Sequence, residues 1–167
     1  MDRKKDYKRA ELAAKASLLP IRIAQGSLGP KLPKKPLWLS QQHRILSEGT
    51  RIQEVFSDEA TLIPAKALKT ERGISARARD SAKLTYYHLL FDHHEIIWAN
   101  GLMCESLLLG DEAWQNIGIE GRHQMRGLTS LPVEMDYKSH PCRRLISVTA
   151  VKRRLRENDK QQSEMIA

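Results

Sequence analysis

The stretch from Thr85 to Ser106 constrains the fold of this chain more than any other part of the sequence. It is rich in aromatic and β-branched residues, and the Asn-Gly pair at 100–101 is a strong signal for a hairpin turn. Three strands are predicted here, over Leu84–Phe91, Glu95–Ala99 and Leu102–Cys104. A turn at Asp92–His94 would join the first two as a hairpin. Three of the six histidines of the chain lie in this stretch, so it is the first place to look for proton-transfer chemistry.

Further short strands are predicted before this stretch. Their alternating or continuously apolar residues are bounded by Gly, Pro and Ser, which is typical of strands. They cover Leu19–Ala24, Leu37–Ser40, His43–Leu46 and Thr61–Pro64. Residues 25–36 are predicted to form a loop because they hold two glycines and three prolines. Residues 69–81 are polar and are expected to form an exposed excursion.

Helices are predicted at both ends. Residues 2–18 favour a helix of poor amphipathicity that ends before Pro20. Two short helices are expected after Asp111 and over Glu120–Arg126, and Ser147 can cap a last helix. The sequence therefore indicates a mainly β fold with flanking α-helices. We expect three parts: a basic helical leader over 1–18, a β domain over 19–109 and a helical extension over 110–167.

The charge of the chain is concentrated at its ends. The net charge is +8, and residues 1–35 and 138–160 both carry a large excess of Lys and Arg. Basic ends can bind nucleic acid, but no aromatic residues interleave with the C-terminal cluster, so solvated helix faces are the preferred interpretation. No segment has the length of a membrane span or the pattern of a secretory signal. We expect a cytoplasmic protein with reduced thiols, while secretion by a non-cleaved route stays open.

Two groups of residues could carry chemistry. His88, His93 and His94 with Asp92 and Glu95 could suggest a metal site, but neighbouring residues of a strand or turn point in different directions, so hydrogen-bonded turn histidines are preferred. No cofactor or metal is therefore expected. The second group is Ser40-Gln-Gln-His43, in which a hydroxyl and an imidazole can converge on one carbonyl across a bend.

Taken together, the two groups resemble the Hint superfamily, the self-processing domains of inteins and hedgehog proteins. The likeness is greatest to the bacterial Hint-domain branch, and it lies in Leu37-Trp-Leu-Ser-Gln-Gln-His-Arg44 and in the segment from Tyr86 to Ser106. It runs from about Leu19 to Leu109. The resemblance implies part of a horseshoe-like β-fold and a function related to autocatalytic cleavage of the chain.

The resemblance also implies roles for individual residues. Ser40 and His43 stand in the TxxH block that activates the scissile peptide. His88 occupies the position of an aspartate in a later block, where it would move a proton or orient a group. Glu95 stands where that block has histidine, and His94 lies one residue earlier. For His88, a hydrogen-bonded core histidine remains an equal alternative.

Two departures from the family argue against self-cleavage. Glu105 and Ser106 replace the histidine and asparagine that end an intein, so cleavage at that point is not expected. The cysteine or serine nucleophile that opens a Hint domain has no counterpart before Leu19, and Cys104 and Cys142 lie far downstream of its position. The first hypothesis is therefore a partial Hint domain that is not autocatalytic by itself.

Two other hypotheses remain open. One is a split processing element completed by a separate N-terminal piece, and the other is a basic module that binds nucleic acid or another partner. A partial β-horseshoe would also leave strand edges unpaired, so pairing with an N-terminal Hint fragment or with another copy of the chain is expected.

Overall fold

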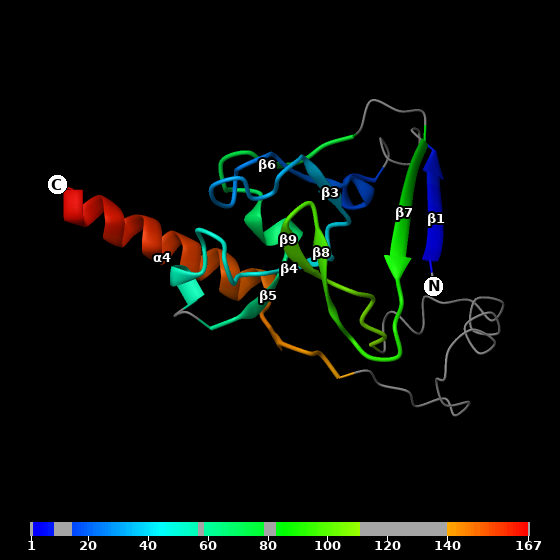
Figure 1. The fold of residues 1–167 in the computed structure, drawn as a ribbon. Helices are drawn as coiled ribbons and strands as arrows, with labels where there is room; N and C mark the ends of the chain where they lie inside the picture. The colour runs from blue at the N-terminus through cyan, green and yellow to red at the C-terminus, as the bar shows by residue number, and fades with distance from the viewer. Residues whose placement is uncertain (1, 9–14, 57–58, 79–82, 111–139, 167) are drawn as a thin grey trace.

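The computed structural model describes residues 2–8, 15–56, 59–78, 83–110 and 140–166. These residues form a mainly β structure with one long helix, α4, over Val148–Ile166 (Figure 1). The strands belong to three small sheets, of which the five-stranded and three-stranded sheets share one apolar core. The mainly β fold that the sequence predicts is confirmed.

The largest sheet has five strands in the order β10-β5-β4-β9-β8. They cover Arg144–Leu145, Thr61–Pro64, Arg44–Leu46, Leu102–Glu105 and Ile96–Ala99. All neighbours are antiparallel except β10 and β5, which are parallel. Every residue of β5 is buried, which is the pattern of a strand at the centre of a core. The strands predicted at 61–64, 95–99 and 102–104 are confirmed here.

The second sheet has the order β3-β2-β6, with strands over Leu37–Leu39, Ile21–Ile23 and Ile74–Ala76. Strand β6 corrects the expectation of an exposed excursion over 69–81. Ile74 pairs with Ile23 in the sheet and is only 4% exposed. The segment has too few apolar residues for a periodic pattern, so the strand could not be predicted from it. The strand forms because β2 provides a hydrogen-bonding edge and an apolar neighbour for Ile74.

The third sheet is a two-stranded ribbon of β1 over Asp2–Lys8 and β7 over Lys83–Leu89. The prediction of a helix over 2–18 is therefore wrong for residues 2–8. The two strands pair antiparallel along their whole length, from Asp2 opposite Leu89 to Lys8 opposite Lys83. A weakly amphipathic segment gains little from packing as a helix. Hydrogen bonding to the edge of β7 therefore outweighs the weak helical preference of residues 2–8. A short 3-10 helix, η1, follows at Ala16–Leu18.

The hairpin expected around Asp92–His94 is also wrong, because β7 pairs with β1 and not with β8. Strand β8 instead pairs with β9 through the Asn100-Gly101 turn, as the second turn signal predicts. Both turn residues have positive φ, 51° at Asn100 and 87° at Gly101. This is the backbone of a type I′ turn, which the Asn-Gly pair favours.

Replacing Gly101 with alanine is expected to destabilise the fold by about 1 kcal/mol or more, because an L-residue is strained at this φ. The added Cβ would also lie 3.1 Å from Cγ of Lys34. Chemical denaturation would measure the change. Gly110→Ala is the matched control, since its Cβ would meet no atom within 4 Å. Equal stability of the two variants would contradict the assigned turn.

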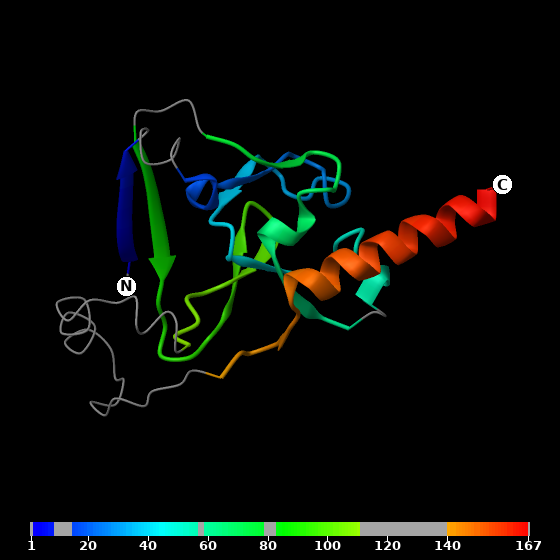
Figure 2. The same cartoon turned by 180° about the vertical axis from the view of Figure 1, so that it is seen from behind.

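Helix α4 packs its first half on the domain and carries its second half away from it (Figures 1 and 2). The cap predicted at Ser147 is confirmed, because its hydroxyl accepts a hydrogen bond from the Ala150 N–H at 3.2 Å. Val151 and Leu155 are buried, and the Arg154 guanidinium lies 5.5 Å from the centre of the Phe56 ring. The two short helices expected after Asp111 lie outside the described residues.

The core joins the five-stranded and three-stranded sheets to two 3-10 helices, η2 over Glu54–Phe56 and η3 over Ala65–Leu68, against which α4 packs. Its fully buried large side chains include Phe56, Ile21, Ile23, Ile45, Ile63 and Leu68. Among the described residues, no helix is long and apolar enough to cross a membrane.

Candidate functional site

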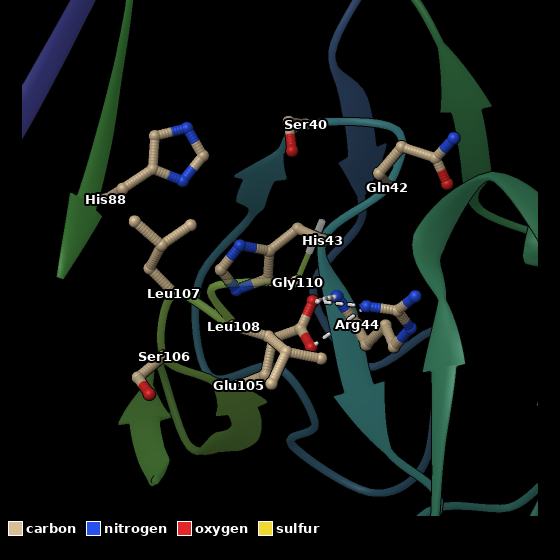
Figure 3. A pocket seen from close by; sticks show the side chains of 10 residues that line it. All are labelled: Ser40, Gln42, His43, Arg44, His88, Glu105, Ser106, Leu107, Leu108 and Gly110. Carbon is tan, nitrogen blue, oxygen red and sulfur yellow. Dashed lines mark hydrogen bonds and ion pairs between the residues drawn. The ribbon is translucent and has the colours of Figure 1, made fainter. Parts of the chain in front are cut away.

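A cavity of about 460 Å³ opens where β7, the start of β4 and the end of β9 come together. Figure 3 shows the side chains around it. The residues that line it are Ser40, Gln42, His43, Arg44, His88, Glu105, Ser106, Leu107, Leu108 and Gly110. Three of the five candidate residues, Ser40, His43 and His88, therefore line one cavity although they come from two distant parts of the sequence.

Ser40 and His43 are brought together by the bend between β3 and β4. The His43 N–H donates a hydrogen bond to the Ser40 carbonyl oxygen at 3.2 Å, which closes a tight turn. Both residues are half-buried. In Figure 3 the Ser40 hydroxyl and the His43 ring both point toward the cavity, while Gln42 between them points away. The three-residue spacing thus places a hydroxyl and an imidazole on the same side of the bend.

His88 reaches the cavity from the opposite wall, on β7. The side chains of β7 alternate between the two faces of the strand: Leu84 and Leu90 are buried, whereas Tyr87 and Leu89 are 59% and 39% exposed. His88 lies on the same face as the two buried leucines and is itself half-buried. The alternation of the strand therefore turns the His88 ring inward.

The environment of His43 favours its neutral form. Burial is the largest cause and lowers the pKa of His43 from 6.5 to about 4. The negative charge of Glu105 acts in the opposite direction, and His88 and Arg44 add to the lowering. At neutral pH the ring is therefore an uncharged imidazole that can accept a proton.

Glu105 and Arg44 form the charged side of the cavity, and the sequence did not point to either as a site residue. Oε1 of Glu105 accepts hydrogen bonds from the Arg44 backbone N–H at 2.9 Å and from Nη1 at 3.3 Å, and Oε2 lies 3.2 Å from Nη1. Burial acts to raise the pKa of Glu105, but hydrogen bonding to His94 and the charge of Arg44 outweigh it, so the pKa lies below its ordinary value. Two features of the sequence could have indicated these residues. Arg44 directly follows His43, and Glu105 stands at the position of the intein histidine.

His94 lies behind the cavity rather than in it. It is 3% exposed, and its Nδ1 accepts a hydrogen bond from the Cys142 N–H at 3.1 Å. Because Nδ1 is an acceptor, the ring proton belongs on Nε2, which lies 3.4 Å from Oε2 of Glu105. His94 therefore supports Glu105 and joins the β8–β9 hairpin to the segment that leads into α4.

Glu95 is not brought to the cavity, and its side chain is exposed. Its backbone does contribute, because the Glu95 N–H donates to the Ser106 hydroxyl and the Ser106 N–H donates to the Glu95 carbonyl oxygen, both at 2.8 Å. The role that the resemblance gives to the Glu95 side chain thus has no contact with Ser40, His43 or His88 to support it.

The two cysteines do not line this cavity. Cys104 is fully buried in β9, and burial raises the pKa of its thiol to about 12. Burial also raises the pKa of Cys142. Both thiols are free and neither is activated as a nucleophile. Within the described ranges, no group of three or more His, Cys, Asp or Glu residues has a metal-binding arrangement.

Comparison with known families decides what this fold is, because the model of the Hint domain family matches residues 2–111. The chain belongs to the Hint domain family. The match includes β1, all three sheets apart from β10, and every residue that lines the cavity. Neither the curated proteins nor the solved structures gave a match to the chain. The cavity thus lies within the matched part of the chain, and α4 lies beyond it.

Proposed function

We propose that this Hint domain holds the proton-transfer half of a self-processing centre and does not cleave itself without a nucleophile from another segment. The observation that carries the proposal is the convergence of Ser40, His43 and His88 on one cavity. A hydroxyl donor and two imidazoles around a space of this size can hold a peptide bond and move its protons.

The reaction would be an acyl shift. A hydroxyl or thiol of the incoming segment attacks the carbonyl carbon of the adjacent peptide bond, and its proton passes to the neutral His43 ring. The Ser40 hydroxyl donates a hydrogen bond to the carbonyl oxygen as negative charge develops there. The C–N bond then breaks, an ester or thioester forms, and the proton passes from a histidine to the leaving nitrogen.

The groups that line the cavity support the need for an external nucleophile. Besides Ser40, the cavity has one hydroxyl, that of Ser106, which is 2% exposed and held by the Glu95 N–H. The thiol of Cys104 is buried and protonated, and Cys142 lies outside the cavity. Glu105 binds Arg44 where an intein has the histidine that assists asparagine cyclisation, which supports the absence of cleavage at 105–106.

Exposed apolar side chains on β7 and, separately, on β8 support pairing with another polypeptide. Tyr87, Leu89 and Phe91 alternate along and just beyond β7 with exposures of 59%, 39% and 44%, and Trp98 on β8 is 71% exposed. Exposed aromatic residues of this kind are common at protein interfaces. An N-terminal Hint fragment is the partner that would also supply the missing nucleophile, and a second copy of the chain is the alternative.

Intact-mass spectrometry tests the proposal. The purified chain is incubated alone and together with N-terminal fragments of related Hint domains that carry a cysteine or serine after a reporter peptide. Hydroxylamine is added to both samples, because it attacks the ester or thioester carbonyl and releases the reporter as its hydroxamate. We expect no mass change in the chain alone and release of the reporter in a mixture that forms a complex by size-exclusion chromatography. Cleavage of the chain alone, or a stable complex that releases no reporter, would overturn the proposal.

A further inference from the structure

We propose that Glu105 is the positioning residue for His43: its carboxylate anchors the backbone next to His43 and stabilises the imidazolium that forms when His43 takes a proton. The inference rests on the proposed function, because it assigns a role within the same cavity. It concerns a residue at which the sequence departs from the intein pattern, so the family likeness does not supply it.

The register of the large sheet brings Glu105 to His43. Strands β4 and β9 are antiparallel with Ile45 opposite Cys104, so the next pair toward the cavity is Arg44 opposite Glu105. The Arg44 N–H that binds Oε1 of Glu105 belongs to the peptide unit formed with the His43 carbonyl group. A movement of this carboxylate would therefore move the main chain of His43 directly.

Two groups of Arg44 donate hydrogen bonds to the carboxylate, and the ring of His94 lies beside it. The Arg44 backbone binds Oε1, the Arg44 guanidinium reaches both oxygens, and Nε2 of His94 lies 3.4 Å from Oε2. Glu105 is 5% exposed, and the ring of His94 is itself anchored by the Cys142 N–H. A buried carboxylate with this many donors stays ionised and has one orientation.

The charges around His43 explain why an anion is needed there. Arg44, His88 and His94 each disfavour a positive ring, and Glu105 is the group among its charged neighbours that favours one. A proton taken up by His43 during the reaction therefore depends on Glu105 for electrostatic stabilisation. The carboxylate of a Ser-His-Asp triad also stabilises an imidazolium by its charge, and there it accepts a hydrogen bond from the ring as well.

NMR titration of the His43 ring in wild type and Glu105→Gln tests the inference. Glutamine keeps the shape and an oxygen acceptor for the Arg44 N–H but removes the charge, so the pKa of His43 is expected to fall by about one unit or more. Glu95→Gln, which removes an exposed carboxylate two elements away from the ring, should leave it unchanged. An unaltered pKa in folded Glu105→Gln would overturn the inference.

A second variant covers the case in which Glu105→Gln does not fold. Glu105→Asp retains the charge but moves it away from the His43 ring, so the pKa of His43 should fall below its wild-type value; no fall would overturn the inference. In the reporter assay, Glu105→Gln should slow release and change its pH profile, and an unchanged profile would count against Glu105. If wild type releases no reporter at all, the proposed function fails while the titration still decides the role of Glu105.

Discussion

Lowering the pH from about 6.5 to about 4 is expected to reduce the free energy of unfolding by on the order of 3 kcal/mol through His43 alone. The pKa of His43 is about 4 in the folded chain against 6.5 for the free side chain, because burial disfavours the charged ring. Between these two pH values, the unfolded chain therefore binds a proton on His43 that the folded chain does not bind. Stability is full above pH 6.5 and falls as the pH approaches 4. Urea unfolding at a series of pH values measures it.

The contribution of His43 can be separated from that of other groups. In His43→Gln the ring cannot titrate, so stability should vary much less over this pH range. His93→Gln removes an exposed histidine of the nearby turn and should keep the wild-type slope. A His43→Gln variant that loses as much stability as wild type over this pH range would contradict the neutral state of the His43 ring. The low pKa of Glu105 places its own effect at more acidic pH.

Arg44→Ala is expected to destabilise the fold by about 3 kcal/mol, since it leaves the carboxylate of Glu105 buried without its cation. The Glu105 side chain is 7% exposed and that of Arg44 is 25% exposed, so water cannot fully replace the lost partner. The loss should shrink at low pH, where Glu105 can take up a proton. Chemical denaturation at pH 7 and at about pH 4 provides both measurements.

Two further variants show whether the effect comes from the buried pair. Arg153 and Glu157 form an exposed pair on α4, with side chains 71% and 62% exposed, so Arg153→Ala should change stability by roughly 0.5 kcal/mol or less. Replacing both partners, as in Arg44→Met with Glu105→Leu, should recover much of the loss because no unpaired charge remains. Equal losses of stability in Arg44→Ala and Arg153→Ala would mean that the buried pair contributes no more to stability than the exposed pair.

Local patterns in the sequence predicted the parts of the fold that depend on neighbouring residues. The Asn100-Gly101 pair predicted the β8–β9 hairpin, and Ser147 with the apolar spacing of Val151 and Leu155 predicted α4. The strand over Thr61–Pro64 was predictable because the run is short, apolar and closed by proline. In each case the interactions that form the element lie within a few residues of one another.

Pairings between distant segments could not be predicted in the same way. Strand β1 forms because it pairs with the edge of β7, which lies far along the chain. Residues 2–8 alone give no sign of this pairing. For the same reason the sequence did not indicate the contact between Glu105 and Arg44, which depends on the register of β4 and β9. Ser40, His43 and His88 could be named as candidates from the sequence because a family resemblance carries information about distant contacts that local periodicity does not.

Reporter release by the chain mixed with a nucleophile-bearing N-terminal fragment tests the central claim most directly when His43→Ala is compared with His93→Ala. Both variants remove one histidine, but only His43 lines the cavity. Loss of a proton-transfer residue typically slows a reaction by roughly 10²–10⁴-fold. The account predicts a loss of that size for His43→Ala and wild-type release for His93→Ala, measured by intact mass. Equal release by the two variants, with both folded and bound to the fragment, would contradict it.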